Sequence, residues 1–395
     1  MVVGSSVPTA VPLIDLAPAM SELPEEILDV CRDILRSGDF IGGSFVEHFE
    51  ANWAAYCGRR YAVGVANGTD AIELALRGLG IGRGDEVIVP TNTFIATAEA
   101  VSRAGAVPVF CDVDDATLLM TPRSAAGVLT PRTVAVIAVH LYGQPCDMEA
   151  LTAFANSTGL MLIEDAAQAH GASWQARKVG SWGVASCFSF YPTKNLGAAG
   201  DAGAVTTDDP WLASRIRALG NHGRSISDGN RHEMLGCNSR LDALQAAILS
   251  AKLPHLDRWT QQRESLVQLY RSRLKDLPGV LLVSEPPPAS CAHHLNVVRI
   301  CDRERVAQVL ARRGIGTAIH YPVPCHLQPA FAGSSVSLPV AESAAGELLT
   351  LPLFPQLEEA RVHDVCDALA DAVSAPSLVG QRDHRTPTTD GGHAA

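Results

Sequence analysis

Residues 187–203 read CFSFYPTKNLGAAGDAG, and a lysine in this stretch decides how the whole chain is interpreted. Aromatic and small side chains alternate over residues 185–191, as expected for a β-strand. Lys194 follows that strand and precedes Gly197 and Gly200, which have no side chain that could shield it. Such a lysine is either an ordinary surface residue or a reactive amine, and the rest of the sequence must distinguish the two.

The sequence around this stretch alternates between short apolar strands and helical segments. The predicted strands are residues 61–66, 85–90, 106–113, 133–141, 160–165 and 185–191. A helix is predicted over residues 70–80, with Asp70 and Glu73 as a capping box. Apolar strands that alternate with helices predict an α/β fold, in which a parallel sheet is covered on both faces.

The C-terminal third of the chain predicts a second, smaller α/β unit. A helical region from residue 240 to about 277 is broken by Pro254. The elements expected after a proline-rich linker are a strand at 295–300, a helix at 303–313, a strand at 315–319 and a last helix near 358–374. We therefore predict a large domain over residues 11–277 and a small domain over 278–375. The polar, Gly- and Pro-containing segments 1–10 and 376–395 are expected to be disordered.

Composition excludes several classes of protein. The 395 residues carry 31 basic and 42 acidic side chains, a formal net charge of -11, which argues against nucleic acid as a partner. Ten cysteines without any CxxC pair indicate reduced thiols rather than a disulfide framework. No apolar run is long enough to span a membrane, and the N-terminus lacks the features of a signal peptide. We expect a soluble, cytoplasmic protein.

The histidines do not predict a metal site. The candidate ligands His293, His294, His320 and His326 show no recurring spacing with cysteine or aspartate. We predict no bound metal.

Three predicted strands are followed by residues that could bind one cofactor together. Gly68 and Thr69 follow the first strand and open a helix, which suits an anion. Asp165 ends a buried strand, where a carboxylate is costly unless a positive group neutralises it. Lys194 follows the strand that contains Ser189. In a parallel sheet these strand ends meet at one edge, where ligands bind.

Each of these features alone also fits a structural role, as a helix cap, a turn or a surface lysine. Together they match the needs of pyridoxal 5'-phosphate, which requires a phosphate site, a carboxylate for its pyridine nitrogen and a lysine for its aldehyde. The amine of that lysine must have a lowered pKa to attack near neutral pH. Lys194 is therefore predicted to be a reactive group.

Several longer motifs, in uninterrupted order over residues 11–374, resemble one known family. They include VANGTDAIELALRGLG, IEDAAQAHGA, FSFYPTKNLGAAGDAGAV and GIGTAIHYPVPCHLQPAF. This pattern is similar to the DegT/DnrJ/EryC1/StrS family of pyridoxal-phosphate-dependent aminotransferases of nucleotide-linked keto sugars. The resemblance implies the aspartate-aminotransferase fold, with a mostly parallel seven-stranded sheet, and a homodimer whose active sites are shared between subunits.

The resemblance also implies roles for individual residues. Lys194 would be the Schiff-base lysine, Asp165 would pair with the pyridine nitrogen and Gln168 would lie near the ring's phenolic oxygen. The residues that would bind the phosphate are Gly68, Thr69, Ser189 and, from the partner subunit, Asn238. Phe94 would stack on the ring. The residues expected to face the sugar are Tyr191, His320 and Tyr321.

We accordingly predict an aminotransferase that moves nitrogen from L-glutamate, through pyridoxamine phosphate, to a nucleotide-linked keto sugar. The sequence around Tyr191 is similar to members that aminate C3 of a 3-keto-6-deoxyhexose, and we expect this sugar to be linked to dTDP. The alternatives are a C4 aminotransferase and a non-catalytic regulatory relative, while Lys194 argues against a sugar dehydratase with histidine at that position. Gly229-Asn230 and Asn296 depart from the family's pattern, which leaves the preference for sugar and base open.

Overall fold

The computed structural model describes residues 10–375, apart from residues 23, 226–227, 286 and 334–335. The α-helices are α1 (Ala17–Ser21), α2 (Pro24–Ser37), α3 (Ser44–Cys57), α4 (Gly68–Gly78), α5 (Ala96–Arg103), α6 (Pro122–Ala126), α7 (Met148–Thr158), α8 (Pro210–Gly220), α9 (Ala243–Lys252), α10 (Leu256–Leu274), α11 (Arg303–Arg312), α12 (Pro339–Ala345) and α13 (Glu359–Ser374). Short 3₁₀ helices are η1 (Leu141–Gly143), η2 (Leu253–His255), η3 (Cys325–Leu327) and η4 (Pro329–Phe331). The strands are β1 (Tyr61–Val65), β2 (Glu86–Pro90), β3 (Val107–Cys111), β4 (Thr133–Val139), β5 (Met161–Asp165), β6 (Ser173–Trp174), β7 (Arg177–Lys178), β8 (Ala185–Ser189), β9 (Gly203–Thr207), β10 (Leu281–Leu282), β11 (Ala289–Ser290), β12 (Asn296–Arg299) and β13 (Leu348–Leu351).

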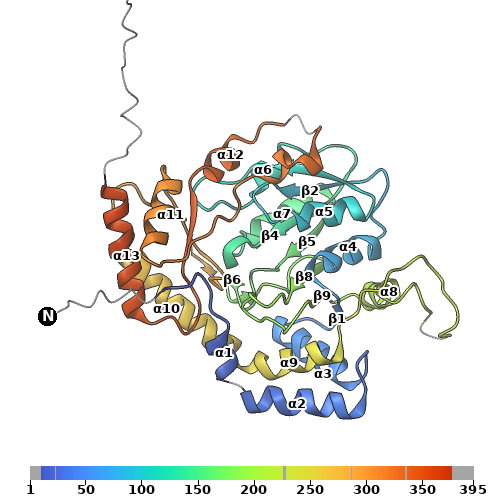
Figure 1. Ribbon diagram of the computed structural model, residues 1–395. Coiled ribbons are helices and arrows are strands. Elements are labelled where there is room, and N and C mark those ends of the chain that lie inside the picture. Colours follow the sequence, from blue (N-terminus) through green and yellow to red (C-terminus); the bar gives the residue numbers. More distant parts are fainter. Residues whose placement is uncertain (1–9, 23, 226–227, 286, 334–335, 376–395) are drawn as a thin grey trace, which may run out of the picture.

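A seven-stranded sheet forms the large part of the molecule (Figure 1). Its strand order is β1-β9-β8-β5-β4-β2-β3, and the pairs from β8 to β3 are all parallel. β9 runs antiparallel to both of its neighbours. The α/β fold with a mostly parallel seven-stranded sheet is confirmed, and β9 is the strand for which the sequence pattern suggested no range.

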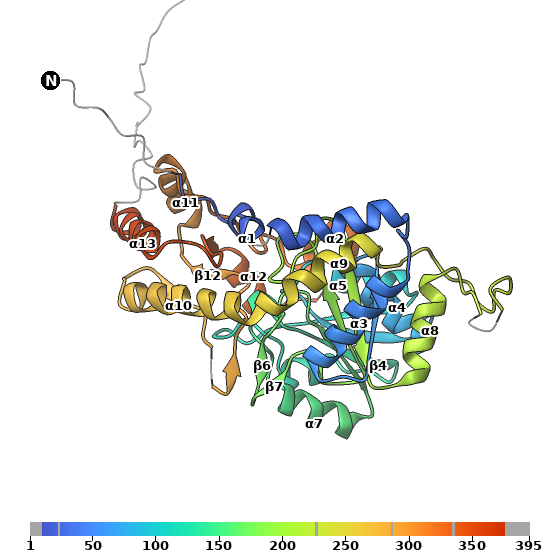
Figure 2. The same cartoon turned by 90° about the horizontal axis from the view of Figure 1, so that it is seen from below.

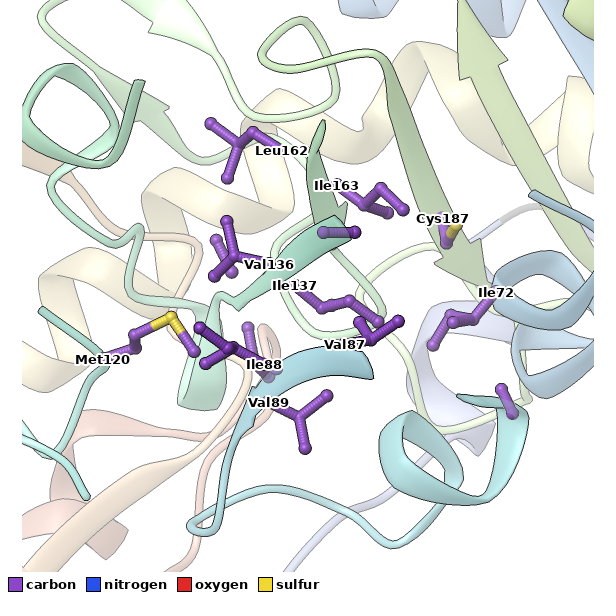
Figure 3. Packing of buried hydrophobic residues seen from close by; sticks show 14 of the residues in the cluster. Ile72, Val87, Ile88, Val89, Met120, Val136, Ile137, Leu162, Ile163 and Cys187 are labelled. Carbon is purple, nitrogen blue, oxygen red and sulfur yellow. The ribbon is translucent and has the colours of Figure 1, made fainter. Parts of the chain in front are cut away.

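The centre of the sheet is apolar on both faces. Val136 and Ile137 are fully buried neighbours on β4, and their side chains point to opposite faces. Figure 3 shows them packed among side chains from β2 and β5. Each buried aliphatic side chain of this size stabilises the fold by roughly 1.5–3 kcal/mol. A strand that is buried on both faces requires helices on both sides, which explains the continuous apolar runs in the sequence.

The helices form two layers around β1, β9 and β8. Val205 of β9 packs in the cluster that contains α4 and α8, whereas the adjacent Ala204 packs in the cluster that contains α3 and α9. α2, α3 and α9 lie together on one side of the molecule, as seen in both views (Figures 1 and 2). The segment that carries Lys194 lies between β8 and β9, so helices from both layers surround it.

The smaller unit packs around α10, α11 and α13 at one end of the molecule (Figure 2). Its three-stranded sheet has the order β10-β12-β13. The predicted strand at 315–319 is wrong: Ile315 and Ala318 form only isolated bridges. At Gly316 an added Cβ would lie 2.8 Å from the backbone nitrogen of Leu13, because the N-terminal segment crosses there. β13 pairs with β12 instead.

The predicted domain boundaries remain a prediction. The packing of the apolar clusters shows which elements lie together on either side of them. Val11 and the buried apolar residues of the second half of α10, from Leu266 to Leu274, belong to the same apolar cluster as β12 and β13. The predicted break at Pro254 corresponds to η2, which separates α9 from α10. The expected disorder of segments 1–10 and 376–395 lies outside the described residues, except for the exposed Ala10. Within the described ranges, no helix is long and apolar enough to cross a bilayer.

Candidate active site

A cavity of about 530 Å³ opens where β1, β5 and β8 end. Parallel strands present their carboxyl ends at one edge, so residues far apart in the sequence meet there. Ten of the predicted site residues line the cavity: Gly68, Thr69, Phe94, Asp165, Gln168, Ser189, Tyr191, Lys194, His320 and Tyr321. Asn238 does not line it. It is exposed and forms an isolated β-bridge with Asn221.

The start of α4 forms one wall of the cavity. The predicted capping box is wrong, because the Asn67 side chain caps this helix by accepting a hydrogen bond from the Asp70 N–H at 2.8 Å. Glu73 instead forms an ion pair with Arg77 at 2.9 Å. The helix therefore begins two residues before the predicted start, at Gly68. A Cβ at Gly68 would lie 2.6 Å from the Ser189 Cβ, so only glycine allows this helix start to approach β8 so closely.

Asp165 lies at the end of β5 and is almost fully buried, with 6% of its surface exposed. Its Oδ2 accepts a hydrogen bond from the Thr97 hydroxyl at 2.7 Å, and its Oδ1 accepts one from the Ala167 N–H at 3.2 Å. Thr97 in turn contacts the Thr93 hydroxyl at 2.8 Å. These donors are neutral, and no cation of the described chain forms a hydrogen bond or ion pair with the carboxylate. A protonated ring nitrogen in the cavity would do so.

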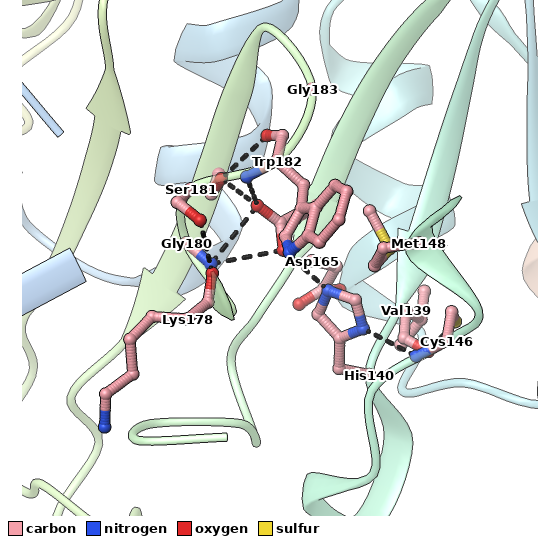
Figure 4. A network of polar contacts seen from close by, with 12 residues as sticks. Val139, His140, Cys146, Met148, Asp165, Lys178, Gly180, Ser181, Trp182 and Gly183 are labelled. Atoms are coloured by element: carbon pink, nitrogen blue, oxygen red, sulfur yellow. Dashed lines mark hydrogen bonds and ion pairs between the residues drawn. The ribbon is translucent and has the colours of Figure 1, made fainter. Parts of the chain in front are cut away.

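Glu164, the residue before Asp165, points to the other face of β5, because side chains alternate along a strand. Its carboxylate accepts hydrogen bonds from the N–H groups of Gly180 and Trp182, the latter at 2.8 Å (Figure 4). The carboxylate also accepts a hydrogen bond from the Ser186 hydroxyl. Its Oε2 lies 2.9 Å from Nε2 of the His140 ring. This network holds the end of β5 in place from the face of the sheet opposite Asp165.

Lys194 lies on a tight loop after β8. Its backbone N–H donates to the Tyr191 carbonyl at 2.8 Å, and the next residue, Asn195, donates to the Ala292 carbonyl at 2.6 Å. Burial lowers the pKa of the Lys194 amine to about 8, even though the nearby Asp165 carboxylate opposes the shift. The loop thus holds a lysine whose neutral amine is more populated near neutral pH than that of an exposed lysine.

Two aromatic rings and an amide line the side of the cavity. Gln168 donates to the Tyr321 hydroxyl at 3.1 Å and accepts from the Tyr142 N–H at 2.7 Å. The rings of Phe94 and Tyr321 lie 5.6 Å apart. Phe94 is 54% exposed although it borders a cavity, so a planar ligand could cover its face.

Two histidines contribute uncharged rings to the same cavity. Burial, and to a lesser extent Lys194, lowers the pKa of His320 to about 4, and its Nδ1 lies 2.8 Å from the Thr350 hydroxyl. The same causes lower the pKa of His294, whose Nδ1 lies 3.1 Å from the Asn195 side chain. Near neutral pH both rings are neutral and can donate or accept a hydrogen bond.

Sequence reasoning missed three residues with direct roles in this arrangement. Thr97 lies one helical turn after Phe94, a spacing that could have suggested a shared orientation. The sequence pattern suggests His294 only as a candidate metal ligand, and it does not suggest His140. The described residues contain no group of three or more side chains that could share a metal ion. Asn296, noted as a departure from the family's pattern, is buried in β12 and does not line the cavity.

The lining residues fit pyridoxal phosphate. The start of α4 with Thr69 and Ser189 could hold a phosphate, since helix N-termini bind anions through free N–H groups. Asp165 could hold a protonated ring nitrogen, and Lys194 could bond an aldehyde. The close approach of Gly68 to Ser189 leaves this anion site free of side-chain bulk.

Comparisons with known proteins agree with this geometry. Residues 21–370 match the model of the DegT/DnrJ/EryC1/StrS aminotransferase family. The chain is 49% identical to the erythromycin biosynthesis sensory transduction protein EryC1 of Saccharopolyspora erythraea, over 92% of this chain and 100% of that protein. It is 47% identical to the dTDP-3-amino-3,4,6-trideoxy-alpha-D-glucose transaminase of Streptomyces venezuelae, over 91% of this chain and 96% of the relative.

Solved structures show the same similarity. The crystal structure of DesV from S. venezuelae, in complex with a ketimine intermediate, aligns with a TM-score of 0.90 at 46% identity, covering 93% of this chain and 100% of that chain. NtdA from Bacillus subtilis, solved with bound cofactor PMP, aligns with a TM-score of 0.86 at 30% identity, covering 93% of this chain and 86% of that chain.

Proposed function

Because this chain belongs to the DegT/DnrJ/EryC1/StrS family, and is therefore a pyridoxal-phosphate-dependent aminotransferase, we propose that it aminates a nucleotide-linked sugar. The amino donor is L-glutamate, and the acceptor is the C3 keto group of a dTDP-linked 3-keto-6-deoxyhexose. The observation that carries this proposal is the 47% identity, over 96% of its length, to a transaminase named for a dTDP-3-amino sugar. The ten free cysteines support a cytoplasmic location, where thiols are kept reduced.

The bound cofactor supplies a covalent carrier for nitrogen and a ring that accepts negative charge. In our proposal the Lys194 amine would hold the cofactor's aldehyde and, when free, would accept and donate a proton at the reacting carbon atoms. Asp165 would favour a protonated ring nitrogen, with Thr97 fixing the orientation of its carboxylate. Gln168 would serve the ring's phenolic oxygen. Gly68, Thr69 and Ser189 would hold the phosphate.

The remaining lining residues provide the contacts to rings and sugar. Phe94 covers one face of the cofactor ring and excludes water from it. Tyr191, which is 52% exposed, faces the sugar together with His320 and Tyr321. His320 acts as a neutral hydrogen-bonding group, since its pKa is lowered to about 4.

The preference for C3 rests on Tyr191. Lys194 and the ring contacts fix the position of the reacting carbon, so the way the sugar is turned decides which carbon is presented. Tyr191 lies three residues before Lys194 and lines the same cavity, so its phenol can influence how the sugar is turned. Offering 3-keto and 4-keto dTDP-sugars separately, with the new amine located by proton NMR, tests this preference. Exclusive turnover of the 4-keto sugar would show that the C4 alternative is correct.

We also propose a homodimer in which Asn238 reaches the cofactor phosphate of the partner subunit. Its exposed position outside its own subunit's cavity supports this role. Mixing the inactive variants Lys194→Ala and Asn238→Asp gives hybrid dimers with one intact site if the sites are shared. Random mixing should then restore about a quarter of wild-type activity. Complete inactivity after proven subunit exchange would mean that each site is self-contained.

The name of the EryC1 relative as a sensory transduction protein favours one alternative, a non-catalytic regulator. Lys194→Ala separates the two functions. In an enzyme this variant should still bind the cofactor but lose all transamination, and borohydride should attach the cofactor covalently to the wild type alone. Wild-type turnover by the variant would contradict the role proposed for Lys194, and the absence of any turnover by wild type on a panel of keto sugars would favour a regulator.

A further inference from the structure

A second cavity, of about 200 Å³, adjoins the loop that carries Lys194. It shares only Thr193 and Lys194 with the first cavity. Its other walls are the N-terminal segment 14–20, the loop residues up to Ala199, and side chains of α9 and α10. None of the roles proposed above uses this space.

Two buried cations line the second cavity. Lys252, at the end of α9, is 7% exposed, and its ammonium makes one hydrogen bond, to the Gly197 carbonyl at 2.5 Å. Arg263, on α10, is 5% exposed. Its Nη1 donates to the carbonyls of His293 and Leu353, while its Nε has no partner among the described residues.

Neither cation forms an ion pair with a carboxylate in the described part of the chain. Burial lowers the pKa of Lys252 to about 8 and that of Arg263 to about 10, as expected for charges without a counter-ion. A buried charge without a counter-ion is energetically costly. An anion in the cavity would remove this cost for both groups.

The lining also limits the kind of anion. Asp15 is the acidic residue of the lining, and its Oδ1 accepts a hydrogen bond from the Ala17 N–H at 3.0 Å. Much of the remaining surface is apolar, from Leu16, Met20 and Trp259 among others. A short aliphatic acid suits a small space whose lining combines two cations with apolar side chains.

We propose that this second cavity binds a small aliphatic carboxylate, with the carboxylate paired to Lys252 and Arg263. The ligand belongs to the same chemical class as the amino donor and its keto-acid product, but the site goes beyond the proposed reaction.

Glutarate tests the proposal, because it has two carboxylates and no amino group to transfer. Isothermal titration of the cofactor-loaded protein should show that Lys252→Met weakens glutarate binding at least tenfold. Ala19→Phe, which narrows the cavity without changing charge, should have a similar effect. Lys275→Met serves as the matched control, since Lys275 is exposed at the end of α10 and should leave binding unchanged.

Wild-type affinity in both cavity variants would place glutarate elsewhere, including in the first cavity, and would overturn the proposal. So would inorganic phosphate binding as tightly as glutarate, because the apolar walls should favour the organic acid. If circular dichroism shows that Lys252→Met is unfolded, Ala19→Phe alone decides. The titration contains no sugar and no amino donor, so its result does not depend on the proposed reaction.

Discussion

Glu164 and Asp165 are adjacent carboxylates on β5, yet they face opposite sides of the sheet and meet different chemistry. Glu164 accepts hydrogen bonds from two backbone N–H groups, a hydroxyl and a histidine ring in a closed network. Asp165 accepts one from Thr97 and one from Ala167, and it borders an open cavity. A fully satisfied carboxylate has no capacity left for a ligand.

The comparison indicates that the hydrogen-bond partners of a carboxylate separate a structural acid from a functional one. Residue type and position in the chain do not. Both side chains are at least 94% buried, so burial alone does not distinguish them. Glu164 should therefore matter for stability, and Asp165 for chemistry.

The largest expected effect is that of Asp165→Asn on turnover. An amide cannot hold a ring proton by charge, and the loss of this interaction should raise the barrier by about 2–4 kcal/mol, which lowers kcat about 30- to 1000-fold. Steady-state kinetics measures this change, and circular dichroism should show an intact fold. Activity within threefold of wild type would place the functional carboxylate elsewhere.

The next test concerns Lys194, which lines the same cavity as Asp165. It measures how the rate of cofactor binding depends on pH. Only the neutral amine attacks an aldehyde, and its fraction rises with pH up to the lowered pKa of about 8. The rate at which added pyridoxal phosphate binds should therefore fall about tenfold for each pH unit below 8 and level off above it. N-acetyl-lysine amide, whose amine is exposed to water, is the control and should show no plateau below pH 10. The same profile for protein and control would contradict a buried, perturbed amine.

Glu164→Gln converts the neighbouring carboxylate to an amide and is the matched control for Asp165→Asn. It replaces an acceptor with a donor that faces other donors, so we expect the free energy of unfolding to fall by about 2–3 kcal/mol. Urea denaturation measures this loss, and kcat of the folded fraction should stay near that of wild type. A variant of normal stability with kcat as low as that of Asp165→Asn would reverse the roles of the two faces.

Thr97→Val should have the smallest effect, because it removes one neutral donor to Asp165 while preserving shape. A net loss of about 1 kcal/mol predicts a kcat about fivefold lower. Thr93→Val is the control: its hydroxyl contacts Thr97 rather than the carboxylate, so its effect should be smaller. Equal effects of the two variants would mean that Thr97 does not act through Asp165.

The sequence by itself determined the layered α/β fold and the edge of the sheet at which the site lies. Apolar strands that alternate with helices allow few arrangements other than a covered parallel sheet, and the ends of such strands converge. Gly68, Asp165 and Lys194 could therefore be placed together from their positions after β1, at the end of β5 and after β8. Local patterns sufficed because each residue is positioned by its own strand.

The tertiary structure alone decided what surrounds those residues. The Thr97 hydroxyl reaches Asp165 across 68 positions of sequence, and Lys252 reaches Gly197 across 55. The strand at 315–319 failed for the same reason, since Ile315 bridges to Val11 of the N-terminal segment and Ala318 bridges to Thr350 of β13, so no continuous ladder forms. Burial, pKa and hydrogen-bond partners depend on which distant segments pack together, and that packing is a property of the folded chain rather than of any local pattern.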